Sequence, residues 1–371
     1  MDKIIERYES NLNRYNSFST MLESLLGSIL LNNDVHPHSI SSRVKKKESL
    51  TQKIERKGSY EDIEDITDVV GVRIITHYSD EVDIIAKIIE EEFDVDVDNS
   101  IDKRKSLEPD KFGYLSLHYI VALSRNRREL AENRHYKSFK AEIQIRSILQ
   151  HTWAEIEHDT GYKSSIEVPY HIRRQFSRLA GLLEIADEQF INIKKSLVEY
   201  KQTVSSEIKE NKQKIIDLNS ISYREYVTSS EAVSLICDSI FSETHIKFEV
   251  KTNLRATSAV SYIRSSLRQL EYHGIKDVRA LDEKVVEHKE FIVERIKRVI
   301  NKRPEGKEGP VPIELLGVYL SQAIAAKDGD KNEIKKFIEF ALVTATEERK
   351  KEFVTTLLSI HRKIAQKFRE K

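Results

Sequence analysis

Residues 104–163 contain the pattern that decides the fold: RKSLEPDKFGYLSLHYIVAL at 104–123, a charged spacer, and KAEIQIRSILQHTWAEIEHDTGYK at 140–163. The run at 115–123 is apolar apart from Ser116 and His118 and contains Tyr119, Ile120 and Val121, which predicts a strand. The run at 141–145 alternates apolar and polar residues, which predicts a second strand. A helical pattern follows from about residue 147 to 158. Two strands and a helix in this order predict the centre of a sheet that packs against helices.

The upstream sequence continues this mixture of helices and strands. Residues 1–32 place apolar side chains three and four apart, which predicts an amphipathic helix. Residues 39–57 are predicted to form a second helix that ends at Gly58. The β-branched run VVGVRIITHY at 69–78 predicts a buried strand, followed by a helix over 80–93 and a weak strand over 93–97. The order predicts an α+β domain, a mixed β-sheet flanked by helices.

A long helix is predicted after Pro169, where apolar residues alternate spacings of four and three. These residues are Ile172, Phe176, Leu179, Leu183, Ala186, Phe190, Ile193 and Leu197. Such a seam belongs either to a helix packed on the sheet domain or to a coiled coil that joins two copies of the chain. Residues 221–371 contain further helical patterns, interrupted by the loop NKRPEGKEGPVP at 301–312. We therefore expect two domains, 1–200 with the sheet and an all-α domain over 201–371.

Composition narrows the class of protein. The chain has 61 basic and 61 acidic residues in 371, so its net charge gives no argument for nucleic-acid or membrane binding. Cys237 is the single cysteine, which excludes an internal disulfide and fits a reducing compartment. The first thirty residues lack the continuous apolar core of a signal peptide or membrane span. We expect a cytoplasmic protein without membrane association.

A basic cluster, RVKKKESLTQK, occupies residues 43–53. On the predicted helix, Lys46, Ser49 and Lys53 lie on one face, which can hold a triphosphate because phosphate oxygens accept bonds from several cations at once. The alternative is a solvated charged face. Downstream, Asp68 opens the predicted buried strand and Arg73 lies inside its apolar run. Buried charges need a partner, so these two residues form either a structural pair or part of a ligand site.

Two predicted strands carry polar side chains on one face each. Residues 114, 116 and 118 alternate on the first, and Glu142 and Gln144 alternate on the second. Without further evidence, the aromatic residues of the first strand are best interpreted as packing residues, and Glu142 of the second strand as a solvated residue on an edge strand. Downstream, His151, Glu155 and His158 share one helical face, but their spacing differs from the HExxH of zinc sites, so we set zinc aside.

Four motifs in this order, RVK with Ser and Lys, DVVGVR, GYLSLH and EIQIR, resemble the synthetase domain of the RelA/SpoT alarmone synthetase family over roughly residues 40–190. The helix at 151–158 is similar to a WAxxEH segment that supports the nucleotide site in that family. The resemblance implies a nucleotidyltransferase-like fold in which Asp68 and Glu142 are catalytic and hold Mg²⁺. It implies ATP contacts from Arg43, Lys45, Ser49, Lys53 and Arg73, with the adenine between Arg43 and Arg73.

For the acceptor nucleotide, the resemblance implies contacts from Lys111, Tyr114, Ser116, His118 and Gln144. The family has Lys-Pro-Asn before Gly-Tyr, whereas this chain has Pro-Asp-Lys-Phe at 109–112. The reaction implied is transfer of pyrophosphate from ATP to the 3′-hydroxyl of GDP or GTP, which releases AMP and makes (p)ppGpp. About forty residues precede the basic motif, so we expect synthesis without a hydrolase domain.

Three other interpretations remain open. A toxic member of the family would pyrophosphorylate adenine nucleotides or the 3′ end of tRNA, with the basic stretches 125–128 and 134–140 on tRNA phosphates. A nucleotide-sensing module without activity would not need both Asp68 and Glu142. The C-terminal half could, in addition, bind a protein partner or inhibit the synthetase domain.

Overall fold

A five-stranded mixed sheet forms the centre of the first of two units, Met1–Lys195 and Ser196–Lys371, into which the chain divides. The computed structural model describes residues 2–102, 116–160, 169–209, 215–249, 257–303 and 309–369. The strands are β1 Ser39–Val44, β2 Val70–Thr76, β3 Phe93–Asp102, β4 Leu117–Leu123 and β5 Ala141–Ser147. Their order across the sheet is β1-β2-β5-β4-β3; β2 and β5 are parallel, and the other neighbours are antiparallel. The predicted mixed sheet is confirmed.

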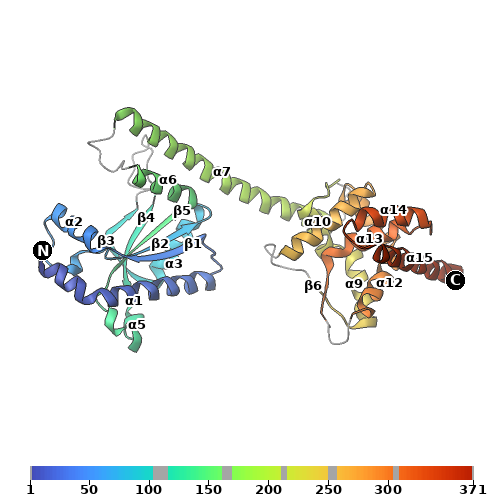
Figure 1. Cartoon of the computed structure of the whole chain (residues 1–371), viewed down its shortest axis with the longest axis horizontal. Helices are drawn as coiled ribbons and strands as arrows, with labels where there is room; N and C mark the ends of the chain where they lie inside the picture. The colour runs from blue at the N-terminus through green and yellow to red at the C-terminus, as the bar shows by residue number, and fades with distance from the viewer. Residues whose placement is uncertain are drawn as a thin grey trace. The chain divides into compact units, whose positions relative to one another are not determined.

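Helices α1 Asp2–Asn32 and α3 Asp80–Glu92 cover one face of the sheet, and α6 Ile148–Asp159 lies over the other (Figure 1). The apolar sides of α1 and α3 form a core with inward strand residues such as Val72, Ile143 and Ile145. Because side chains alternate along a strand, the intervening residues of β2 and β5 point to the face that α6 covers. Shorter elements complete the unit: α2 Lys47–Lys57, η1 Ile63–Asp65, α5 Arg125–Arg128 and η2 Ala131–Tyr136.

The predicted helix over residues 39–57 is wrong in its first third. Ser39–Val44 forms β1, which pairs antiparallel with β2 from Ser39 opposite Ile75 to Val44 opposite Val70. These backbone bonds to a distant strand outweigh the local helical pattern, an effect that the 39–57 window cannot reveal. The second part is confirmed: α2 ends at Gly58, whose φ of 63° suits a residue without a side chain.

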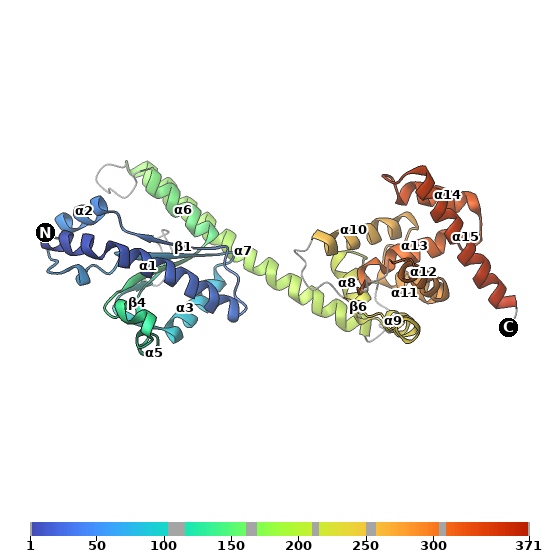
Figure 2. The same cartoon turned by 60° about the horizontal axis from the view of Figure 1, so that its bottom comes forward.

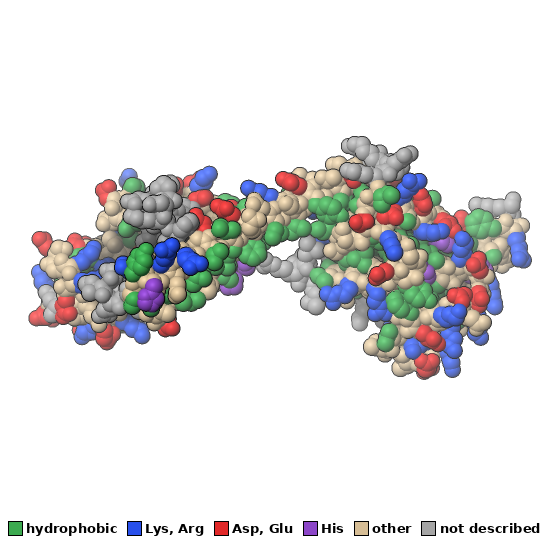
Figure 3. Space-filling model, turned by 90° about the horizontal axis from the view of Figure 1, so that it is seen from above, with side chains coloured by type: hydrophobic (Ala, Val, Ile, Leu, Met, Phe, Trp, Pro, Cys, Tyr) green, Lys and Arg blue, Asp and Glu red, His purple; other side chains and the backbone are tan. Residues whose placement is uncertain are grey.

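Helix α7 Tyr170–Lys209 confirms the predicted long helix. It packs on the sheet unit through Phe176, which contacts Trp153, and through the buried Asp187, whose Oδ2 accepts a 2.6 Å hydrogen bond from Ser147. Four of the eight seam residues, Leu179, Phe190, Ile193 and Leu197, are exposed. Phe190 and Ile193 are 50% and 55% exposed, and hydrophobic side chains are visible along α7 in Figure 3. Of the two alternatives for the seam, packing on the sheet unit holds for Phe176, whereas half of the seam residues are exposed.

The second unit is built almost entirely of helices, in the order shown in Figure 2. They are α8 Ser220–Ser229, α9 Glu231–Thr244, α10 Thr257–Tyr272, α11 Val278–Glu287, α12 Lys289–Asn301, α13 Leu316–Ala325, α14 Lys331–Ala341 and α15 Glu347–Arg369. Two short parallel segments, β6 Phe248–Glu249 and β7 Val311–Pro312, and η3 Ile313–Leu315 lie among them.

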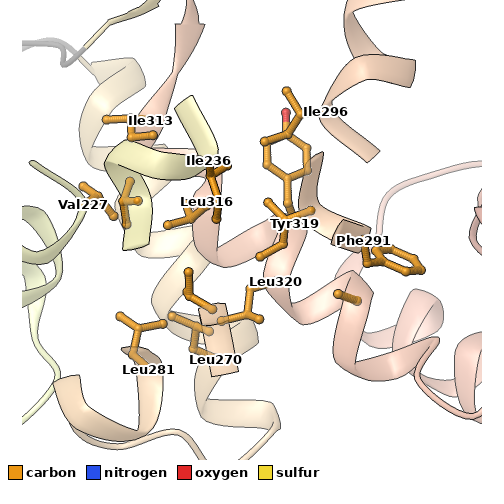
Figure 4. Close-up of a cluster of buried hydrophobic side chains, with 14 of the residues drawn as sticks. Val227, Ile236, Leu270, Leu281, Phe291, Ile296, Ile313, Leu316, Tyr319 and Leu320 are labelled. Carbon is orange, nitrogen blue, oxygen red and sulfur yellow. The ribbon is translucent and has the colours of Figure 1, made fainter. Parts of the chain in front are cut away.

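This unit has a hydrophobic core of its own. Figure 4 shows part of it, where side chains from several helices meet around Leu316 and Leu320 of α13. The fully buried Tyr223 accepts a 2.8 Å hydrogen bond from the Gly317 backbone N–H and donates to the Glu314 carbonyl. The predicted helical C-terminal region is confirmed. None of the helices in the described ranges is long and apolar enough to cross a membrane.

Candidate active site

The strand register places the polar residues of three distant motifs in rows across the sheet. Arg43 of β1 is opposite Gly71 of β2, which is opposite Glu142 of β5. In the next row, Arg73 is opposite Gln144, which is opposite His118 of β4. All lie on the face that α6 covers. The glycine leaves the position between Arg43 and Glu142 without a side chain, which opens a floor for a ligand.

A pocket of about 530 Å³ stands on this floor. Its walls come from β1, the start of α2, β2, β5 and the end of α6. The lining residues are Ser41, Ser42, Arg43, Val44, Lys45, Lys46, Ser49, Asp68, Gly71, Val72, Arg73, Glu142, Gln144 and His158. This volume falls in the range of small-molecule sites, and most of the lining side chains carry charges or hydrogen-bonding groups.

Asp68 is held between two lysines just before β2 begins. Its Oδ2 is 2.8 Å from Lys45 Nζ, and its Oδ1 is 2.7 Å from Lys53 Nζ. Burial works to raise the pKa of the Asp68 carboxyl, but the hydrogen bonds and charges of the two lysines outweigh it, so the pKa lies below its usual value. Asp68 is therefore ionised at neutral pH, and the two lysines lie beside it, available to phosphate groups.

Glu142 is held by two neighbours on the sheet. His118 Nδ1 lies 2.8 Å from Glu142 Oε1, and Gln144 Nε2 donates a 2.8 Å hydrogen bond to Oε2. Burial works to raise the pKa of Glu142, but the hydrogen bond and charge of His118 and the hydrogen bond of Gln144 together outweigh it, so the pKa lies below its usual value. The charge of Asp68 acts in the opposite direction, which shows that the two carboxylates are close enough to repel each other.

The two carboxylates fit a magnesium ion. Mg²⁺ prefers oxygen ligands and is commonly bound by one or two carboxylates together with substrate phosphates. Asp68 and Glu142 are both ionised and both line the pocket, close to cations that suit phosphate. Within the described ranges, no group of three or more His, Cys, Asp or Glu side chains could hold a metal by itself. An ion at this site would therefore be shared with a ligand.

Most of the predicted site residues meet here. Seven line the pocket: Arg43, Lys45, Ser49, Asp68, Arg73, Glu142 and Gln144. Lys53 reaches it through Asp68, and His118 through Glu142. Ser116 is fully buried and does not line the pocket. Lys111 and Tyr114 lie outside the described residues, so their roles stay predictions.

Several lining residues were not predicted from the sequence. Ser41 and Ser42 belong to β1, which was predicted as a helix, so no pattern pointed to them. His158 belongs to the helical face that was weighed and rejected as a zinc set. It is also the histidine of the WAxxEH segment, which the resemblance places in support of the nucleotide site, and it lines the pocket. The carboxylate of Glu155, the second residue of that zinc set, lies 3.0 Å from Arg73 and 3.4 Å from Arg146. The helical spacing of residues 155 and 158 was the signal that could have placed Glu155 beside the predicted nucleotide site as well.

Comparison with known proteins agrees with the motifs. A family model described as the region found in RelA / SpoT proteins matches residues 42–167. GTP pyrophosphokinase YwaC of Bacillus subtilis (strain 168) is 32% identical over 173 residues, which cover 44% of this chain and 79% of YwaC. GTP pyrophosphokinase YjbM of the same organism is 28% identical over 176 residues, 47% of this chain and 80% of YjbM.

A crystal structure of the small alarmone synthetase 1 from Bacillus subtilis is similar at 26% identity and a TM-score of 0.44, over 52% of this chain and 99% of that one. The sequence matches carry the assignment, because YwaC is matched above 30% identity over most of its own length. The chain therefore belongs to the RelA/SpoT family.

Proposed function

We propose that this chain transfers the β,γ-pyrophosphate of ATP to the 3′-hydroxyl of GDP or GTP, which makes (p)ppGpp and releases AMP. One observation carries the proposal: two ionised carboxylates from separate strands share a pocket with arginines and lysines suited to a triphosphate. Such a transfer depends on positioning two nucleotides and on neutralising phosphate charge.

The donor side of the pocket fits ATP. Lys45 and Lys53 would bind the phosphates as cations, with Ser49 at the start of α2 as a hydrogen-bonding group. Arg43 and Arg73 come from neighbouring strands, and their planar guanidinium groups suit the faces of an adenine ring. Arg73 forms an ion pair with Glu155, which holds one end of its guanidinium.

The acceptor side fits a hydroxyl that must lose a proton. Glu142 is ionised and partly buried at the pocket wall, so it can take the proton from the 3′-hydroxyl as that oxygen attacks the β-phosphorus and the bond to the α-phosphate oxygen breaks. His118 and Gln144 fix its two oxygens. Asp68 and Glu142 would hold Mg²⁺, which when bound neutralises charge on the transferred phosphates.

The acceptor identity separates this proposal from the alternative. A tRNA acceptor would use basic residues of 125–140, but Arg127, Arg128 and Lys140 form ion pairs with Glu92, Asp94 and Asp96 of the same unit. Labelled ATP offered together with GDP, GTP, ADP and tRNA tests the acceptor, with the products separated by anion exchange and gel electrophoresis. We expect label in a guanosine nucleotide. Label on the tRNA 3′ end would replace the guanosine acceptor, and no transfer would refute the function.

For the second unit we propose a regulatory role. It has its own core, and the matched family region ends at residue 167, before this unit begins. A helical unit attached to a catalytic one can bind a protein partner or restrain the catalytic unit. Removing residues 215–371 should then change the rate of transfer, while leaving ATP binding intact. An unchanged rate would contradict this role.

A further inference from the structure

Glu155 of α6 bridges an arginine in the pocket and an arginine buried beneath it. Its Oε1 is 3.0 Å from Arg73 Nη1 and 3.4 Å from Arg146 Nη2. The side chain of Arg146 is only 3% exposed, so it is fixed by its surroundings, whereas the Arg73 side chain is 27% exposed and lines the pocket. The carboxylate therefore links the pocket arginine to the rigid interior of the unit.

The strand itself leaves Arg73 without an acidic neighbour. Its cross-strand partners are Ser41 on β1 and Gln144 on β5, and neither is charged. Among the described residues, its one ion pair is with Glu155. A free arginine has several rotatable bonds and loses considerable entropy when it is held in one orientation. A carboxylate from α6 that fixes the guanidinium before the ligand arrives reduces the entropy that Arg73 loses when the ligand binds.

The sequence motif assigns no role to this glutamate. In the WAxxEH segment, the tryptophan, alanine, glutamate and histidine fall on residues 153, 154, 157 and 158, and Glu155 falls on a variable position. Its place follows from the structure, where α6 crosses above β2 and β5 and brings residue 155 over Arg73.

We propose that Glu155 is a positioning residue, which holds the Arg73 guanidinium in the orientation that receives the adenine of ATP. The inference rests on the proposed function, because Arg73 is assigned to the donor nucleotide there. Glu155 acts through Arg73 and touches no reacting atom. Its removal should therefore weaken donor binding and leave the acceptor side unchanged.

The test measures binding without turnover. Isothermal titration of a non-hydrolysable ATP analogue gives Kd for the full chain, E155Q, E155A and the control D159N, which changes an exposed carboxylate at the end of the same helix. Because the Glu155 side chain is 53% exposed, its contribution should be that of a surface ion pair, so we expect E155A to raise Kd about two- to fivefold. E155Q keeps an acceptor oxygen and should fall between E155A and the unaltered chain. D159N should bind like the unaltered chain.

Two further measurements separate positioning from a general structural effect. In steady-state assays, the KM for ATP should rise by the same factor as Kd, while the KM for the guanosine acceptor stays constant. In a double-mutant cycle with R73M, which keeps side-chain length without the charge, E155A should add no further loss.

Each outcome decides the inference. The inference is overturned if E155A and the unaltered chain have equal Kd, or if both KM values rise equally. It is also overturned if E155A causes the same loss with and without Arg73. If E155A loses its circular dichroism signal, the comparison rests on E155Q, which has the same size as glutamate. If the unaltered chain binds no ATP analogue, the proposed function fails and the inference fails with it. If the unaltered chain binds the analogue and the Glu155 variants bind it equally well, only the inference is refuted.

Discussion

Replacing Glu142 by glutamine tests the proposed chemistry with little change of shape. The amide oxygen of glutamine can still accept from His118, whose Nδ1 lies 2.8 Å from Oε1. The amide nitrogen would face the Gln144 side chain, which now donates to Oε2, so one hydrogen bond is lost unless Gln144 rotates. That loss costs about 1 kcal/mol of the free energy of unfolding.

Other terms offset this cost. The neutral side chain no longer carries the burial penalty of the carboxylate or the repulsion from Asp68. We therefore expect the melting temperature of the sheet unit to move by at most about 2–4 °C. The rate should change far more, because loss of a general base lowers kcat by about 10²- to 10⁴-fold, equivalent to about 3–5 kcal/mol in the barrier.

The assay compares initial rates of guanosine product formation, followed by anion exchange, with thermal unfolding followed by fluorescence of the buried Trp153, the single tryptophan of the chain. E132Q, which neutralises an exposed glutamate of the same unit, serves as the control and should retain the full rate. A rate for E142Q within about tenfold of the unaltered chain, with the fold intact, would refute the assignment of Glu142 as the base.

Three further predictions concern the pocket, the sheet unit and the long helix. G71V should keep the strand, because a Cβ there lies 4.0 Å from Arg43 Cγ, but its side chain fills the pocket floor and should weaken binding of an ATP analogue about tenfold or more in calorimetry. Burial raises the pKa of Asp187 above its unfolded value, so the buried carboxylate lowers the free energy of unfolding at neutral pH. This penalty is lost as the pH falls through the folded pKa and then the unfolded pKa. D187N, whose amide oxygen can accept from Ser147, should therefore be at least as stable as the unaltered chain at pH 7 in urea unfolding, with the advantage shrinking toward low pH. The half-exposed Phe190 and Ile193 on α7 should pair with a second copy, so light scattering should show self-association that F190E reduces.

Each of these has a clear contrary result. If G71V binds the analogue with unchanged affinity, the pocket floor at Gly71 is not part of the binding site. If the stability difference between D187N and the unaltered chain does not change with pH, the charge of the buried carboxylate does not destabilise the fold. A monomeric unaltered chain at all concentrations would leave the α7 seam without a role in self-association.

Local sequence was sufficient for the elements whose signal is contained in a short window. The β-branched run of β2, the alternation of β5 and the periodicity of α1 and α7 each correspond to an element in the structure. Several residues that line the pocket were also predicted to share a site, because the charges of Arg43, Lys45 and Asp68 stand in a recognisable order in the chain. Their roles in binding ATP stay predictions.

Ser39–Val44 shows where such windows fail. Its residues are compatible with either state, and the choice of strand depends on hydrogen bonds to Val70–Thr76, some thirty residues downstream. The error also hid Ser41 and Ser42 from the predicted site, since a helix would have pointed them elsewhere.

The amino-acid sequence by itself determined the class of fold and the chemical groups of the site, because periodicity and residue type are local properties. Only the tertiary structure decided which groups touch: Glu142 with His118, Asp68 with two lysines, and Glu155 with Arg73 and Arg146. These contacts join residues far apart in the sequence: Arg73 and Glu155 are separated by 82 positions. They depend on strand register and on how α6 crosses the sheet, which arise from burial of the whole core and not from any single segment.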